Sequence, residues 1–222
     1  LVGYTNAGKS TILNAFVDIS RSDNSKKVLE EDMLFATLET SVRKIKIKDG
    51  KEFLLSDTVG FIRELPHSLI KAFRSTLEEV KNADLLLHVI DYSDEEYDEN
   101  IRVTNDTLKE IGADNIPVIY VFNKCDKVSN SKLPYIDGNK VYISARNNIG
   151  IDQLIKVISD KVFTHYITCK MEIPFQRGDI TSYLNKKYKF LSTNYTERGT
   201  LIKICLNQKD YGKYKQYIIE QY

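Results

Sequence analysis

The first 165 residues alternate short apolar runs with segments whose apolar positions recur every three or four residues. Continuous apolar runs are typical of strands buried in a parallel sheet, and the periodic segments are typical of amphipathic helices. The expected strands lie at residues 85–90, 118–122 and 141–143. The expected helices lie at residues 11–16, 69–80, 96–111 and 151–163. This alternation predicts an α/β fold in which a mostly parallel sheet carries helices on both of its faces.

A different pattern follows the first expected helix. Residues 18–32 are rich in Ser, Asp and Asn, and we expect them to form a mobile loop. Residues 42–47 alternate apolar and basic side chains, which predicts a half-exposed strand. Asp49-Gly50 is a hairpin turn signal, so residues 53–55 are expected to pair back on that strand.

The pattern changes again at about Tyr166. The remaining strands are expected at residues 169–173, 188–191 and 201–206, and the remaining helices at residues 179–184 and 208–219. This β-α-β-β-α order predicts a small α+β module after the α/β domain. We therefore expect two domains, residues 1–165 and residues 166–222.

The composition is that of a folded globular protein. Hydrophobic residues make up 42% of the 222 residues and charged residues 28%, which excludes a chain that is disordered throughout. No apolar run approaches the roughly 18 residues of a membrane-spanning helix, so no membrane span is expected. The spacing of Cys125, Cys169 and Cys205 excludes a disulfide framework and a CxxC metal site. We expect reduced thiols in a cytoplasmic, monomeric protein.

The net charge is small but unevenly distributed. A formal charge of +1 favours neither a nucleic-acid nor a membrane partner. Residues 160–222, however, contain eleven Lys or Arg, six Asp or Glu, and eight of the fourteen Tyr. Basic residues beside aromatic residues can bind RNA by phosphate contacts and stacking. The same residues are also explained by a solvated helix face whose Tyr side chains cover a small core. Both RNA binding and this structural interpretation stay open.

The amino end of the chain fits the pattern G-x-x-x-x-G-K-[ST]. The glycines let the backbone curl so that N–H groups point at phosphate oxygens, and the following helix adds its positive end. Lys9 supplies a full charge to the β- and γ-phosphates, and the Ser10 hydroxyl can bind Mg²⁺. Since only two residues precede this loop, we expect a fragment of a longer protein with a truncated first strand. The predicted phosphate-binding residues are Gly3, Tyr4, Thr5, Asn6, Ala7, Gly8, Lys9, Ser10 and Thr11.

Two further segments point to the γ-phosphate and the metal. Asp57, at the end of the strand that precedes Thr58-Val59-Gly60, can hold Mg²⁺ through water, and the Gly60 N–H can reach the γ-phosphate. Thr37 can give its hydroxyl to Mg²⁺ only when the γ-phosphate is present, which would make its loop a switch. Thr40 is the alternative for this role. The loop residues expected beside the nucleotide are Phe35, Ala36, Thr37, Leu38 and Glu39.

Two more segments point to the base of the nucleotide. Asn-Lys-Cys-Asp at residues 123–126 follows the apolar run directly, and Asp126 can accept hydrogen bonds from N1–H and the 2-amino group of guanine. Adenine lacks this pair of donors. Lys124 can lay its methylene stem along the base, and the Ala145 N–H can contact guanine O6. The predicted base-binding residues are Asn123, Lys124, Cys125, Asp126, Ser144, Ala145 and Arg146.

The order of these motifs, GYTNAGKS, FATLE, DTVGF, NKCD and SAR, resembles that of a translation-factor-type GTPase. The run DTVGFIRELPHSLIKAFRSTLEE, which begins at Asp57, resembles more specifically the switch II region of HflX, a family of bacterial ribosome-associated GTPases. The resemblance covers essentially the whole chain, and it favours Thr37 over Thr40 as the switch threonine. It implies a GTPase fold that binds GTP or GDP with Mg²⁺ held by Ser10, Thr37 and Asp57. It also implies binding to the large ribosomal subunit, through ribosomal RNA and protein, and the splitting of stalled ribosomes.

Three residues bear on the rate of hydrolysis. Phe61 stands where many GTPases place a Gln that orients the attacking water, so we expect slow intrinsic hydrolysis and a catalytic group from elsewhere. HflX-like proteins share this substitution. Asn6 stands where some GTPases use an Asn to help bind K⁺, although a role in capping the loop has comparable weight. Glu39-Thr40 replaces the family's usual Asp-Pro, which leaves that loop less constrained.

The sequence therefore predicts an Mg²⁺-dependent GTPase that acts as a conformational switch, in which Lys9, Thr37 and Gly60 act at the γ-phosphate. A GTP-regulated module that binds RNA or protein and has negligible turnover is the main alternative, and Phe61 supports it. A P-loop ATPase or kinase is a second alternative, against which the run from Asn123 to Asp126 argues.

Overall fold

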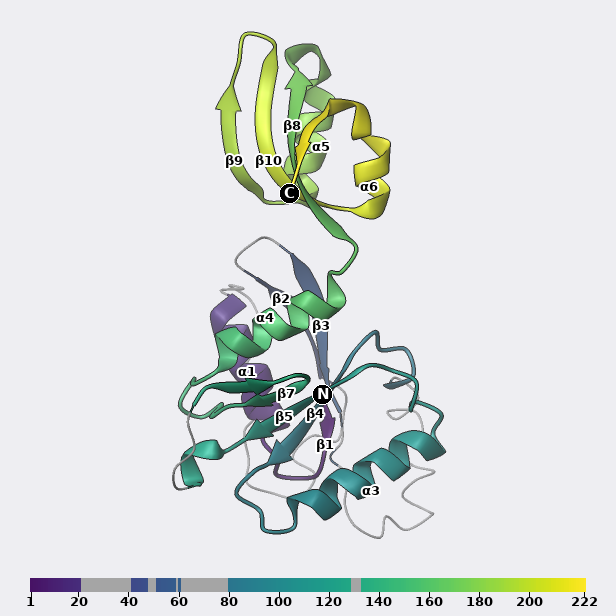
Figure 1. The fold of residues 1–222 in the computed structure, drawn as a ribbon, viewed down its shortest axis with the longest axis vertical. Coiled ribbons are helices and arrows are strands. Elements are labelled where there is room, and N and C mark those ends of the chain that lie inside the picture. Colours follow the sequence, from purple (N-terminus) through teal and green to yellow (C-terminus); the bar gives the residue numbers. More distant parts are fainter. Residues whose placement is uncertain (21–40, 48–50, 59, 61–79, 129–132) are drawn as a thin grey trace. The chain divides into compact units, whose positions relative to one another are not determined.

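The computed structural model describes residues 1–20, 41–47, 51–58, 60, 80–128 and 133–222 (Figure 1). The chain divides into two compact units. The first has the limits Leu1–Ile45 and Phe53–Val162, and the second has the limits Lys46–Glu52 and Phe163–Tyr222. Within the described part of the chain, no helix is long and apolar enough to cross a membrane.

The first unit is built on a five-stranded sheet with the strand order β1-β4-β5-β7-β6. Its strands are β1 (Val2–Gly3), β4 (Leu86–Asp91), β5 (Val118–Asn123), β7 (Lys140–Tyr142) and β6 (Tyr135–Asp137). The first four pair in parallel, and β6 pairs antiparallel with β7. The prediction of a mostly parallel sheet is therefore confirmed. Strand β6 was not predicted, because all of its residues are exposed and give no alternating pattern.

Helices lie on both faces of this sheet, as predicted. They are α1 (Lys9–Ser20), α3 (Tyr97–Glu110) and α4 (Ile151–Val162). Figure 1 shows α1 and α4 on one side of the sheet and α3 on the other. Alternation along β4 fits this arrangement, because Leu86 packs in a core cluster with Leu108 of α3. Leu87 and Val89 point to the opposite face and are equally buried.

Helix α1 is longer than the sequence pattern predicted. The expected helix stopped at residue 16 and a mobile loop was expected from residue 18, but the helix continues to Ser20. Ser20 is buried, and its hydroxyl donates a hydrogen bond of 3.1 Å to the Val17 carbonyl oxygen. The rest of the predicted loop lies outside the described residues, as does the predicted helix at 69–80 apart from Val80.

Strands β2 (Ser41–Lys46) and β3 (Glu52–Asp57) form a two-stranded sheet of their own, which confirms the predicted strand pair. The predicted turn at residues 48–50 lies outside the described part of the chain. What matters for the site is that β3 ends at Asp57.

The second unit follows the order β-α-β-β-α-β. Its elements are β8 (Tyr166–Pro174), α5 (Gly178–Lys187), β9 (Phe190–Tyr195), β10 (Gly199–Asn207), α6 (Gln208–Lys213) and β11 (Ile218–Gln221). The sheet order is β11-β8-β10-β9, and all of these pairs are antiparallel. This is the topology of a split βαβ module.

The prediction of one closing helix over residues 208–219 was wrong. Helix α6 ends at Lys213, and after a short 3₁₀ turn the chain forms β11. Gly212 weakens the end of the helix, and Ile218-Ile219 favours a strand. The edge of β8 offers unpaired backbone groups, and pairing with them overrides the helical periodicity.

The core of the second unit lies between its sheet and its two helices. It consists of alternate residues of β8 and β10 together with residues of α5 and Tyr214, namely Cys169, Met171, Ile173, Ile180, Leu184, Ile202, Ile204, Leu206 and Tyr214. All three cysteines of the chain are buried thiols that form no disulfide. Burial raises the pKa of Cys169 to about 11, so this thiol is protonated and unreactive at neutral pH.

Asp210 of α6 links this helix to the end of α5. Its side chain is 4% exposed, and its Oδ2 accepts a hydrogen bond of 2.6 Å from Lys187 Nζ and another from the Tyr188 hydroxyl. Burial acts to raise the pKa of Asp210, but these hydrogen bonds outweigh it and hold the pKa below its ordinary value. A carboxyl group whose pKa is lower in the folded state stabilises the fold at all pH values above its unfolded pKa. That stabilisation is lost as the pH falls through the folded pKa, which lies below the unfolded one.

We expect Asp210→Asn to lower the free energy of unfolding by about 2 kcal/mol at neutral pH, because an amide is a weaker acceptor for Lys187. The variant should lose less stability than the unaltered protein when the pH falls below about 4. Urea unfolding followed by circular dichroism measures both effects. Asp179→Asn is the matched control, because the Asp179 carboxylate pairs with Arg177 at an exposed site. Equal losses in the two variants would contradict the role given to Asp210.

Candidate functional site

The loop between β1 and α1 is curled tightly. Gly3 and Gly8 have positive φ angles of 143° and 96°, and Asn6 between them has a φ of 60°. A Cβ atom on Gly3 would lie 2.2 Å from the Val89 carbonyl oxygen, and one on Gly8 would lie 2.3 Å from Asn123 Nδ2. Only glycine fits at these two positions. The curl leads directly into the first turn of α1, where backbone N–H groups and the helix dipole favour an anion.

Lys9 is the charged group at this turn. Its side chain is buried, and Nζ donates hydrogen bonds of 3.2 Å to the Gly3 carbonyl oxygen and 3.1 Å to that of Tyr4. Burial lowers the pKa of Lys9 to about 8, and the nearby Asp57 carboxylate partly opposes this effect. A second anion at the turn would stabilise the ammonium form, so the site is suited to phosphate.

The end of β3 meets the same turn. The Ser10 hydroxyl donates a hydrogen bond of 2.7 Å to Asp57 Oδ2, and Asp57 is fully buried. The Thr58 hydroxyl donates a hydrogen bond of 2.7 Å to the Leu1 carbonyl oxygen and so ties the end of β3 to β1. A hydroxyl and a carboxylate side by side are the oxygen ligands that Mg²⁺ takes, with water and phosphate completing its coordination. Ser10 and Asp57 therefore fit the metal that the sequence predicted.

Gly60 lies against the phosphate-binding loop. A Cβ atom on it would come within 2.8 Å of Thr5 Cα and 2.9 Å of Lys9 Nζ. The backbone of Gly60 is thus close to the atom that would bind the terminal phosphate. Val59, Phe61 and all of the predicted loop residues from Phe35 to Glu39, with Thr37 and its rival Thr40, lie outside the described residues.

We expect Gly60→Ala to reduce GTP hydrolysis roughly tenfold or more while GDP binding changes little. The added methyl group must displace Thr5 or Lys9, which disturbs the region of the γ-phosphate and leaves the base-binding residues in place. Single-turnover hydrolysis and GDP titration separate these two effects. Gly178→Ala is the control for a new methyl group, since nothing lies within 4 Å of a Cβ there and its φ of −57° suits alanine. Undiminished hydrolysis by Gly60→Ala would contradict the assignment.

Asn123 joins the end of β5 to the phosphate-binding loop. Its Nδ2 donates a hydrogen bond of 3.0 Å to the Ala7 carbonyl oxygen, and its Oδ1 accepts one of 3.0 Å from the Ala145 N–H. The Ala145 N–H, which the sequence predicted to face guanine O6, is thus bonded to Asn123 in this structure. Its contact with the base stays a prediction.

The neighbours of Asn123 differ in what they can offer a ligand. Asp126 and Arg146 are exposed, whereas Ser144 is fully buried. Cys125 is buried, its Sγ donates to the Phe122 carbonyl oxygen at 3.2 Å, and burial raises its pKa to about 11. Cys125 can therefore contribute only backbone atoms to a nucleotide site, while the Asp126 carboxylate remains accessible.

Asp91, at the end of β4, was missed by the sequence analysis. Its Oδ2 lies 2.8 Å from Lys124 Nζ, and Lys124 has a positive φ of 62°. Its Oδ1 accepts hydrogen bonds of 3.0 Å from the Ser93 N–H and 2.6 Å from the Ser93 hydroxyl. The signal was available, because Asp91 directly follows a buried apolar run, as Asn123 does.

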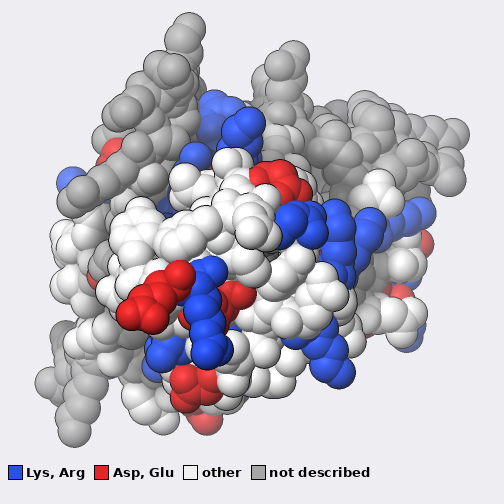
Figure 2. Space-filling model, turned by 90° about the horizontal axis from the view of Figure 1, so that it is seen from above, with Lys and Arg blue, Asp and Glu red and all other residues white. Residues whose placement is uncertain are grey.

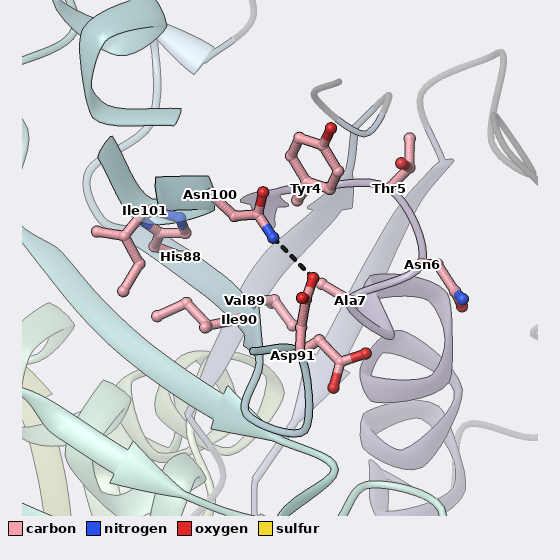
Figure 3. Close-up of a pocket in the computed structure, with 11 residues that line it drawn as sticks. Tyr4, Thr5, Asn6, Ala7, His88, Val89, Ile90, Asp91, Asn100 and Ile101 are labelled. Carbon is pink, nitrogen blue, oxygen red and sulfur yellow. Dashed lines mark hydrogen bonds between the residues drawn. The ribbon is translucent and has the colours of Figure 1, made fainter. Parts of the chain in front are cut away.

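A cavity of about 210 Å³ lies between the phosphate-binding loop, the end of β4 and α3 (Figure 3). Asn100 Nδ2 donates a hydrogen bond of 2.8 Å to Asp94 Oδ2 across one side of it. His88 is buried in its wall, and burial together with the positive charge of Lys9 lowers the pKa of His88 to about 4. His88 is therefore neutral at physiological pH. The lining residues are Tyr4, Thr5, Asn6, Ala7, His88, Val89, Ile90, Asp91, Asp94, Asn100 and Ile101.

The site thus gathers the ends of β1, β3, β4, β5 and β7 around one loop. Carboxyl ends of strands at the edge of an α/β sheet are where such folds bind ligands. Among the described residues there is no group of three or more His, Cys, Asp or Glu that could hold a metal ion by itself. In the described part of the chain, Ser10 and Asp57 are the side chains at this loop that offer oxygen ligands to a metal.

Comparison with known proteins agrees with this geometry. A family model described as "50S ribosome-binding GTPase" matches residues 1–124. A GTPase HflX from Caldanaerobacter subterraneus subsp. tengcongensis is 42% identical over 203 residues, which cover 91% of this chain and 45% of that protein. A GTPase HflX from Akkermansia muciniphila is 37% identical over 229 residues, which cover 100% of this chain and 51% of that protein. The chain thus spans about half the length of the curated relatives it matches.

The fold also has solved counterparts. A GTP-binding protein from the hyperthermophilic archaeon Sulfolobus solfataricus, solved in complex with GDP, is 28% identical with a TM-score of 0.52. The match covers 73% of this chain and 50% of that one. Because the family model matches more than half of the chain and the HflX proteins match it over nearly its whole length, the chain belongs to the HflX family of P-loop GTPases.

Proposed function

We propose that this chain binds GTP and GDP, hydrolyses GTP with the help of Mg²⁺, and acts as a nucleotide-dependent switch. The observation that carries the proposal is the convergence on one loop of Lys9, the Ser10–Asp57 pair and Asn123. Lys9 and Ser10 begin α1 directly after the loop, and Asp57 and Asn123 reach it from the ends of β3 and β5. Together they supply a positive charge, oxygen ligands for a metal and a support for the base-reading segment.

Guanine selection is assigned to the exposed Asp126. Its carboxylate can accept both N1–H and the 2-amino group, and the adjacent Asn123 holds the segment against the phosphate-binding loop. A site built on such hydrogen bonds discriminates strongly against a base that lacks the donors. Competition between GTP and ATP for a labelled guanine nucleotide tests this choice against an ATPase or kinase.

Hydrolysis is proposed as an in-line attack of water on the γ-phosphorus, which gives GDP and inorganic phosphate. Ser10 and Asp57, with Thr37 outside the described residues, would hold Mg²⁺, which neutralises charge on the β- and γ-phosphates when bound. Lys9 stabilises the charge that develops on the transferred group, and the Gly60 N–H positions its oxygens. Because Phe61 cannot orient water, intrinsic turnover is slow. We further propose that Asn6, which is exposed in the loop, helps a K⁺ ion bind beside the phosphates.

The proposed partner is the large ribosomal subunit. The matching family model carries that description, and the HflX relatives are about twice as long as this chain. We propose residues 1–165 as the GTP-binding domain and residues 166–222 as a separate small domain. Figure 2 shows basic and acidic side chains interspersed on the face viewed from above, so charge alone does not make that face an RNA-binding surface.

The test is GTP turnover by this chain in KCl and in NaCl, with and without purified large ribosomal subunits. We expect slow turnover that is faster in KCl and is stimulated by the subunits. Equal rates in the two salts would contradict the proposal that K⁺ binds beside the phosphates. Tight GTP binding without any turnover, with or without subunits, would instead support a GTP-regulated binding module, which Phe61 favours.

A further inference from the structure

The ammonium group of Lys124 is held by a carboxylate from another strand. Lys124 Nζ lies 2.8 Å from Asp91 Oδ2, and the two side chains are only 17% and 22% exposed. An ion pair that is largely shielded from water is stronger than an exposed pair of the same geometry. Lys124 also has a positive φ of 62°, a conformation that non-glycine residues rarely adopt without support from their surroundings.

Asp91 is itself fixed in place. Both the N–H and the hydroxyl of Ser93 donate to its Oδ1, at 3.0 Å and 2.6 Å, which leaves Oδ2 directed at Lys124. Burial acts to raise the pKa of Asp91, but the hydrogen bonds from Lys124 and Ser93 outweigh it and lower the pKa. The carboxyl group is therefore ionised at physiological pH and acts as a fixed negative charge.

The ends of β4 and β5 are also fixed relative to each other. Asp91 and Asn123 are partners in the parallel ladder, and the Tyr92 N–H donates a hydrogen bond of 2.9 Å to the Asn123 carbonyl oxygen. The ring of Tyr92 packs edge-on against Phe122 and Tyr142, whose rings are stacked with centroids 4.6 Å apart. This aromatic cluster lies next to the base-reading segment and limits the movement of Asp91 against it.

We propose that Asp91 is a positioning residue for the guanine base, which it serves by holding the Lys124 side chain in the conformation that the base packs against. This inference rests on the proposed function of the site. With Nζ anchored on Asp91, the four methylene groups of Lys124 are ordered before the nucleotide arrives. Binding then avoids the entropy cost of ordering a flexible side chain.

The consequence is specific to the base. The hydrogen bonds and the ion pair of the Asp91 carboxylate go to Lys124 and Ser93 and not to Lys9 or Asp126, so loss of this carboxylate should leave phosphate binding and base choice intact. The expected signature is weaker binding of every nucleotide that places a base on Lys124. The preference for guanine over hypoxanthine, which lacks the 2-amino group, should remain, because Asp126 sets that preference.

The test is Asp91→Asn in the full chain, titrated with a fluorescent derivative of GDP and competed with GDP, inosine diphosphate and inorganic tripolyphosphate. We expect affinity for GDP and inosine diphosphate to fall roughly tenfold each, and affinity for tripolyphosphate to stay unchanged. Ser93→Ala removes one of the hydrogen bonds that hold Asp91, and it should lower GDP affinity less than Asp91→Asn does. Glu95→Gln, at an exposed position nearby, is the matched control.

Combining Asp91→Asn with Lys124→Met separates positioning from a general structural effect. If Asp91 acts through Lys124, the double variant binds GDP no more weakly than Lys124→Met alone. An additional loss in the double variant, or a parallel loss of tripolyphosphate binding, would overturn the inference. Unchanged GDP affinity in Asp91→Asn would overturn it as well. Failure of the unaltered protein to bind GDP would instead remove the proposed function on which the inference rests.

Discussion

Lys9→Met should abolish measurable GTP hydrolysis, with a loss of at least about hundredfold in turnover. Methionine has a similar length and fills the buried space, but it supplies no charge to the phosphates and no donor to the Gly3 and Tyr4 carbonyl oxygens. GTP binding should weaken more than GDP binding, because the ammonium group serves both the β- and γ-phosphates. Phosphate release under saturating GTP, together with titration of both nucleotides, measures these effects.

The control is Lys127→Met, which removes a positive charge from an exposed position near the base-reading segment. Its turnover should match that of the unaltered protein. If Lys9→Met hydrolyses GTP at a comparable rate, then the buried ammonium group acts only in folding, and the phosphate site must be sought elsewhere.

Asp126→Asn should change the base that the protein prefers. Its carboxylate is exposed, so the substitution should leave the fold intact. The amide offers a donor where guanine presents its own donors, and GDP affinity should fall roughly hundredfold. Xanthine carries a carbonyl group where guanine carries its 2-amino group, and this carbonyl oxygen can accept a hydrogen bond from the amide. Xanthosine diphosphate should therefore bind the variant more tightly than GDP does.

Asp126→Ala distinguishes a change of preference from simple damage. Alanine removes the acceptor without providing a donor. This variant should therefore lose affinity for GDP without gaining affinity for xanthosine diphosphate. Competition of both diphosphates against one fluorescent nucleotide gives the ranking for each variant. An unchanged preference for GDP in Asp126→Asn would show that another group reads the base.

The sequence predicted most of the architecture, because buried parallel strands are encoded locally. The runs that became β4 and β5 are apolar at nearly every position, and both were predicted within one residue. The motif residues at strand ends could be placed for the same reason. Asn123 follows such a run and Asp57 ends the strand expected at residues 53–55, and the structure brings both to the loop that contains Lys9.

Features set by tertiary contacts could not be predicted in this way. Strand β11 exists because β8 has a free edge, and the local sequence looks helical up to that edge. The position of Asp91 after a buried run marks it as a candidate site residue, but its pairing with Lys124 depends on a distance that only the complete fold sets. The hydrogen bond from the Ala145 N–H to Asn123 likewise depends on the final position of β7 beside β5.

The hydrogen bond between Asn123 and Ala7 also has a consequence for how the protein folds. It joins residues that are 116 positions apart in the sequence, so the nucleotide site cannot exist until the sheet between them has assembled. Pairings of such long range make folding slow, because the loop they close must be ordered first. A nucleotide that recognises only the finished site would add its binding free energy to the stability of the first unit alone. GDP would therefore act as a folding ligand, and the first unit should unfold at a higher temperature in its presence while the second unit is unaffected.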